Sequence, residues 1–130
     1  MTIHILTKVV LHDGLTTIGK EAFKGCRSLA EIEIPATVTI IEDDAFCYCN
    51  KLTEITIPDN VAKIGDSAFF HCDELRKVTL GSGLTSFGDE VFRSCGKLNK
   101  IFVPEGMTDH FKQILPEQYH KFLAEPKPKK

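Results

Sequence analysis

The stretch IGDSAFFHCDELRKVTL at residues 64–80 recurs in variant form along the chain and defines its architecture. Its phenylalanine, cysteine and leucine positions repeat every 23 residues without an insertion. The three columns are Phe23, Phe46, Phe69 and Phe92; Cys26, Cys49, Cys72 and Cys95; and Leu29, Leu52, Leu75 and Leu98. Further apolar columns follow the same step. A unit this short cannot bury its apolar side chains alone, so successive coils must stack around one continuous core.

Each coil is predicted to begin with a main strand. Residues 52–57, LTEITI, end in the alternation and β-branched composition of a strand, and Pro58 stops it. The repeat therefore predicts parallel main strands near residues 7–11, 30–34, 53–57, 76–80 and 99–103, forming one sheet along the molecule. A second short extended piece is expected at residues 61–64.

The turn after this second piece carries a repeated aspartate at Asp43, Asp66 and Asp89. A side-chain oxygen at this place favours capping of a single helical or 3₁₀ turn within the same coil. Stacked carboxylates would also attract a calcium ion, which is the alternative interpretation.

The string quoted above resembles the BspA-like (Treponema-type) leucine-rich repeats, and the resemblance covers roughly residues 6–104. It implies a leucine-rich-repeat solenoid with a concave parallel sheet and short turns or 3₁₀ elements on the convex side. It also implies a role in protein recognition or adhesion, and no catalytic residues.

Length and the end of the chain predict one solenoid domain over residues 1–125 of the 130. The repeat pattern fails after Met107, and residues 108–124 are expected to form a helical cap, with a helix at 109–115 and a second turn opened by Pro116. Phe111, Ile114, Leu115, Tyr119 and Phe122 are placed to cover the last coil. The basic tail at residues 126–130, PKPKK, is predicted to be disordered.

Composition removes several classes of partner. Sixteen Lys plus Arg against eighteen Asp plus Glu give a formal charge of −2, so no positive field favours nucleic acid. No apolar run approaches the roughly 20 residues of a membrane helix, which argues against membrane insertion. The first residues do not follow the pattern of a secretory signal. The chain as given is therefore expected in the cytoplasm, whereas the family resemblance favours the cell surface or secretion.

Candidate chemistry is sparse. Four of the five cysteines form one structural column and are expected to be reduced, buried apolar groups, while Cys47 lies off the column and is expected to be a more exposed, reactive thiol. The five histidines show no metal-ligand spacing, and no nucleophile motif is present. The sequence predicts no enzyme, no cofactor and no metal site.

Binding is the remaining function, and residues that alternate with core positions on the main strands must face solvent. One row reads Lys8, Glu31, Glu54, Lys77, Lys100, and the next reads Val10, Glu33, Thr56, Thr79, Phe102. The N-terminal half of this face is acidic and the C-terminal half is basic, which suits a dipolar protein or peptide. The predicted binding residues are Glu31, Glu33, Glu54, Thr56, Arg76, Lys77, Thr79, Lys100 and Phe102.

Three alternatives stay open. The charged face can be a solvated surface whose neighbouring charges pair with each other. The chain can be a structural spacer or a fragment of a larger bacterial surface adhesin, with no ligand of its own. A rival patch combines Tyr48, Phe70 and His71 with Ile40 and Cys47, which all fall off the core columns.

The N-terminal strand at residues 6–11 has no visible cover and predicts a weak homodimer through residues 1–15. Ile3 and Ile5 folding back as a partial cap, or an upstream repeat, would leave a monomer.

Overall fold

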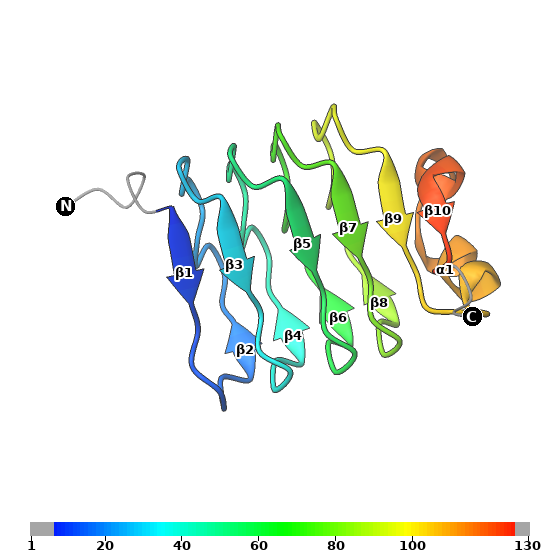
Figure 1. Cartoon of the computed structure of the whole chain (residues 1–130), viewed down its shortest axis with the longest axis horizontal. Coiled ribbons are helices and arrows are strands. Elements are labelled where there is room, and N and C mark those ends of the chain that lie inside the picture. Colours follow the sequence, from blue (N-terminus) through cyan, green and yellow to red (C-terminus); the bar gives the residue numbers. More distant parts are fainter. Residues whose placement is uncertain (1–6, 127–130) are drawn as a thin grey trace.

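A computed structural model of the chain describes residues 7–126 and has the predicted main strands. They are β1 (Lys8–Val10), β3 (Glu31–Glu33), β5 (Glu54–Thr56), β7 (Lys77–Thr79) and β9 (Lys100–Phe102). The pairings among these five strands are parallel and step by one repeat, as in Val9 to Ile32 and Val78 to Ile101. Figure 1 shows the coils side by side along the long axis of the molecule. The stacked coils predicted from the columns, and the solenoid that the resemblance to leucine-rich repeats implies, are confirmed.

The second extended piece of each coil forms a sheet of its own. Its strands are β2 (Thr17–Ile18), β4 (Ile40–Ile41), β6 (Lys63–Ile64) and β8 (Ser86–Phe87), paired in chain order (Figure 1). Backbone bonds extend this ladder at either end of the short strands, for example from Ala62 N to Thr39 O at 2.8 Å. The four coils that contain these strands are therefore joined without interruption on this side.

The main sheet, in contrast, is not one continuous sheet as predicted. Strands β1 and β3 form one sheet, and β5, β7 and β9 belong to another. Within residues 7–126, no strand pairing joins β3 to β5. Glu31 and Glu54 occupy the same row on these two strands, and like charges across neighbouring strands disfavour pairing. Lys77 and Lys100 also share a row and remain paired, so like charge alone does not decide which strands pair.

The turns between the two sheets bond to one another along the stack. Phe46 N donates to Ala68 O at 2.7 Å, and Tyr48 N donates to Phe70 O at 2.8 Å. Tyr48 and His71 adopt left-handed φ angles of 62° and 61°, which L-residues seldom take. A second position of the turn, four residues earlier, has the same conformation, with Asp44 at 58° and Ser67 at 56°. The hydrogen bonds between coils hold the backbone in this otherwise unfavourable conformation.

The repeated aspartates do not cap a turn in their own coil, so that prediction was wrong. The carboxylate of Asp43 accepts a hydrogen bond of 2.8 Å from the backbone N–H of Asp66, and Asp66 accepts one of 2.9 Å from Asp89 N–H. The turn itself is not helical in these coils. The side chain therefore satisfies a backbone donor of the next coil.

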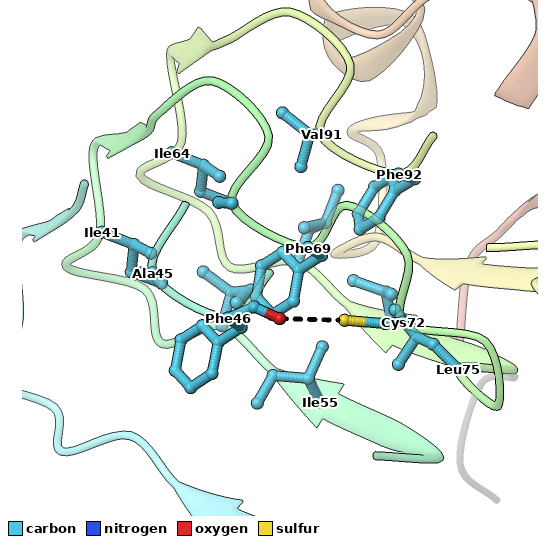
Figure 2. Packing of buried hydrophobic residues seen from close by; sticks show 14 of the residues in the cluster. Ile41, Ala45, Phe46, Ile55, Ile64, Phe69, Cys72, Leu75, Val91 and Phe92 are labelled. Atoms are coloured by element: carbon cyan, nitrogen blue, oxygen red, sulfur yellow. Dashed lines mark hydrogen bonds between the residues drawn. The ribbon is translucent and has the colours of Figure 1, made fainter. Parts of the chain in front are cut away.

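The core is a ladder of stacked aromatic rings and thiols. Phe46 and Phe69 are fully buried, with ring centroids 5.1 Å apart and planes within 3°, and Phe69 lies 5.9 Å from Phe92. Each of three cysteine thiols donates to a phenylalanine carbonyl in the preceding coil. Figure 2 shows this bond from Cys72 Sγ to Phe46 O, at 3.2 Å. The cysteine column is thus part of the packing between coils.

The C-terminal cap contains helix α1 (Thr108–Ile114) and 3₁₀ helix η2 (Glu117–Phe122). Phe111 and Leu115 are buried against the core, while Ile114, Tyr119 and Phe122 are half-buried. The helical cap is close to the predicted one. The sequence missed strand β10 (Leu123–Ala124), which pairs with β9 and extends the main sheet (Figure 1). Of the predicted disordered tail, only Pro126 lies within the described residues.

Candidate interaction surface

The predicted binding residues lie on one face of the main strands, here called the main-sheet face. Register places Glu54, Lys77 and Lys100 in one row and Thr56, Thr79 and Phe102 in the next. Glu31 and Glu33 flank a core residue on β3, and Arg76 immediately precedes β7. Seven of the nine predicted residues are exposed, whereas Thr79 and Phe102 are half-buried. The two-row pattern read from the sequence is therefore present.

The charges on this face are mostly not paired with each other. Within residues 7–126, Arg76 is the only predicted binding residue that forms an ion pair. Its guanidinium lies 3.8 Å from the carboxylate of Glu74. The Glu74 carboxylate also contacts Lys97 at 3.0 Å, and this hydrogen bond lowers the pKa of Glu74. No ion pair within that range joins Glu31 or Glu54 to the lysines beside them. The paired-charge alternative is thus not supported for these rows.

A hollow follows the interruption between β3 and β5. It has a volume of about 580 Å³ and is lined by residues 30–34 and 53–56. We call it the seam groove. Among these lining residues the ionisable side chains are Glu31, Glu33 and Glu54. The acidic half of the main-sheet face is therefore concave at this place.

The rival patch is only partly assembled. Tyr48 stacks on His71 at 4.9 Å, and Phe70 meets both rings edge-on at 5.7 and 5.2 Å. The guanidinium of Arg27 lies over the Tyr48 ring, 5.4 Å from its centre. Figure 1 shows β4, which carries Ile40, in the other sheet of the solenoid.

Cys47 is buried, with 3% of its surface exposed, so the prediction of an exposed reactive thiol was wrong. Burial is also the main reason that the pKa of Cys47 is raised. The sequence placed it off the cysteine column, but its neighbours in the structure cover it almost completely. In the column itself, burial raises the pKa of Cys49 to about 12. Neither thiol has the depressed pKa of a reactive cysteine.

Residues 7–126 hold no group of three His, Cys, Asp or Glu side chains placed to bind a metal ion. They also contain no helix long and apolar enough to cross a membrane.

Family comparison agrees with the repeat geometry. The model of the BspA type leucine-rich repeat region matches residues 2–115 in six copies. The chain belongs to this family. Leucine-rich repeats of this kind form protein-interaction or surface-protein modules, which fits the exposed strand rows. No curated protein matches the chain.

Solved structures show the same fold. A leucine-rich repeat protein from T. pallidum is 33% identical, with a TM-score of 0.72 over 74% of this chain and 45% of its own. A leucine-rich repeat protein from Bacteroides ovatus is 26% identical, with a TM-score of 0.75 over 94% of this chain and 30% of its own. A leucine-rich cell surface protein from Faecalibacterium prausnitzii is 25% identical, with a TM-score of 0.70 over 83% of this chain and 32% of its own. This repeat family member spans less than half the length of each of these proteins.

Proposed function

We propose that this chain is a non-enzymatic module that binds a protein or peptide through the main-sheet face. The observation that carries the proposal is a set of exposed charges of opposite sign on successive strands. Glu31, Glu33 and Glu54 lie at one end, and Lys77 and Lys100 lie at the other. Because these groups form no ion pairs within residues 7–126, they are available to a partner. A dipolar partner would be oriented by the two halves.

A charge-reversal pull-down tests this function. The variant Glu31→Lys/Glu54→Lys/Lys77→Glu inverts the face, while Glu105→Lys/Glu117→Lys/Lys112→Glu makes the same changes at exposed positions from Glu105 onward in the C-terminal region. We expect the first variant to lose partners that the wild type and the control capture, with direct binding then measured on purified components. Unchanged capture by the first variant would contradict the proposal.

A second function is that of a spacer within a larger surface protein. Its support is the length of the similar solved proteins, of which this chain covers 24–45%, and the cell-surface description of one of them. A spacer needs no ligand, so charge reversal would change no capture. If capture of a partner instead depends on Tyr48 and Phe70, the partner binds at the rival patch.

Weak self-association through the N-terminal edge remains a proposal as well. Val10 on β1 is 79% exposed, and β3 is the only strand paired with β1 in the described residues. An apolar side chain on an edge strand favours pairing with another chain. Light scattering at increasing concentration tests this, with Val10→Lys as the comparison. A monomeric wild type, or a dimer indifferent to Val10→Lys, would overturn it.

A further inference from the structure

The missing strand pairing between β3 and β5 is confined to the main-sheet face. Ala30 N donates to Thr7 O at 2.8 Å, and Arg76 N donates to Thr53 O at 2.8 Å. Within residues 7–126, the equivalent hydrogen bond from Thr53 N to Ala30 O is absent. The same two coils are bonded elsewhere, since Tyr48 N donates to Phe70 O at 2.8 Å. The stack therefore holds together while β3 and β5 lie side by side without strand pairing.

The seam groove continues past the ends of the strands. At Glu33, Ile34 and Thr56 it meets a second hollow of about 630 Å³, which is lined by residues 10–13, 33–36, 56 and 58. This second hollow includes the exposed side chain of Val10. The two hollows share these residues and together form an elongated channel, with Val10 exposed at the end away from Glu54. Such a shape suits an extended chain rather than a compact small molecule.

Most of the ionisable side chains that line the channel are acidic. Its lining includes the carboxylates of Glu31, Glu33, Glu54 and Asp13, and His12 is its only basic side chain. None of these carboxylates accepts a side-chain hydrogen bond or joins an ion pair within residues 7–126. The strands outside the seam carry Lys8 and Lys77 in the same row. The carboxylates thus form an acidic strip bordered by lysines.

We propose that the seam groove holds an extended peptide segment that carries lysine or arginine side chains. Alternate side chains of an extended segment point the same way, so its cationic groups reach Glu31, Glu33 and Glu54 while an apolar side chain covers Val10. This inference rests on the proposed function and names the part of the partner that the acidic half recognises. Lys8 and Lys77 restrict the cationic segment to the strip between them by like-charge repulsion.

A binding assay with a defined probe tests the groove. The probe is a fluorescent synthetic peptide in which every second residue is lysine, with valine in place of lysine at one end of that series and threonine between. It is titrated by anisotropy at low ionic strength. Glu31→Gln/Glu54→Gln is expected to weaken binding about tenfold, since each exposed charge pair contributes a fraction of that energy. The control Glu105→Gln/Glu117→Gln has the same net charge, and we expect it to bind as the wild type does.

Binding of the mirror-image peptide distinguishes recognition by a groove of defined shape from non-specific electrostatic attraction. It carries the same charges but cannot present its side chains to β3 and β5 in the same way, so we expect weaker binding. Equal affinity for the two peptides, equal loss in the control variant, or no binding by the wild type would overturn the groove. In the pull-down, partners lost in Lys77→Gln/Lys100→Gln but kept in Glu31→Gln/Glu54→Gln would leave the proposed function standing and overturn this inference alone.

Discussion

The carboxylate of Asp66 accepts a hydrogen bond of 2.9 Å from the backbone N–H of Asp89, one repeat of 23 residues further along the chain. This contact ties one coil to the next and constrains the residue that precedes Asp89. A Cβ added to Gly88 would lie 2.6 Å from both the backbone nitrogen and Oδ1 of Asp66. The glycine is required because the neighbouring coil is so close, and its φ is ordinary.

Gly88→Ala is therefore expected to lower the free energy of unfolding by roughly 1–3 kcal/mol, the usual cost of overpacking. Gly96 is the matched control, because a Cβ there meets nothing within 4 Å. Gly96→Ala should be neutral or stabilise by up to about 1 kcal/mol. Chemical denaturation of both variants checks this, and equal effects would contradict the inter-coil contact.

Removal of the Asp66 side chain leaves the backbone N–H of Asp89 without its acceptor. Asp66→Ala should cost about 0.5–2 kcal/mol, as loss of a backbone cap does elsewhere. Asp66→Asn keeps a carbonyl oxygen at the same place and should retain most of the stability. Thermal unfolding compares them, and an alanine variant as stable as the wild type would show that the bond contributes nothing.

Phe69 and Phe70 are neighbours in sequence with different environments. Phe69 is fully buried between Phe46 and Phe92, whereas Phe70 is half-buried beside Tyr48 and His71. Phe69→Ala should cost about 3–5 kcal/mol, as in other cores. Phe70→Ala should cost about 0.5–1.5 kcal/mol for its aromatic contacts. A reversed order in urea denaturation would contradict the assignment of the core column.

The buried thiol of Cys49 makes stability depend on alkaline pH. Its pKa is about 12 in the folded chain against 9.0 for an ordinary thiol, because burial disfavours the thiolate. Above pH 9 the unfolded chain loses this proton while the folded chain keeps it, so stability falls as pH rises. At a pH about 1.5 units higher the loss attributable to Cys49 should be roughly 2 kcal/mol.

Cys49→Ala is the comparison for this pH dependence. Its overall stability is lower, but the fall between pH 9 and pH 10.5 should be shallower than in the wild type by about 2 kcal/mol. Parallel pH profiles for the two proteins would show that Cys49 does not supply the effect.

The repeat columns were sufficient to predict the strands and the core, because stacked identical units force equivalent residues into equivalent places. Phe69 and Leu75 are buried for that reason, and Glu54 and Lys77 share a row. Features that depend on contacts between coils were missed. The partner of Asp66 lies 23 residues away, and nothing in the local pattern distinguishes this from a cap within the turn.

Two other features of the surface lay beyond the sequence pattern. Leu123 and Ala124 are too few to give a strand signal, and they pair only because the cap returns the chain to β9. The interruption beside Glu31 and Glu54 breaks the rule that every repeat pairs alike. It depends on the packing of these two particular strands, which a pattern shared by all repeats does not show.

Hydrogen exchange at Thr53 tests most directly whether the main-sheet face is divided at the seam groove. The amides of Arg76 and Asn99 occupy the equivalent place in later coils and donate to Thr53 O and Arg76 O, at 2.8 and 3.0 Å. We predict that Thr53 exchanges at least about a hundredfold faster than either of them, since it has no backbone acceptor across the seam. Protection of Thr53 equal to that of Arg76 would mean that β3 and β5 are paired, and would contradict the account.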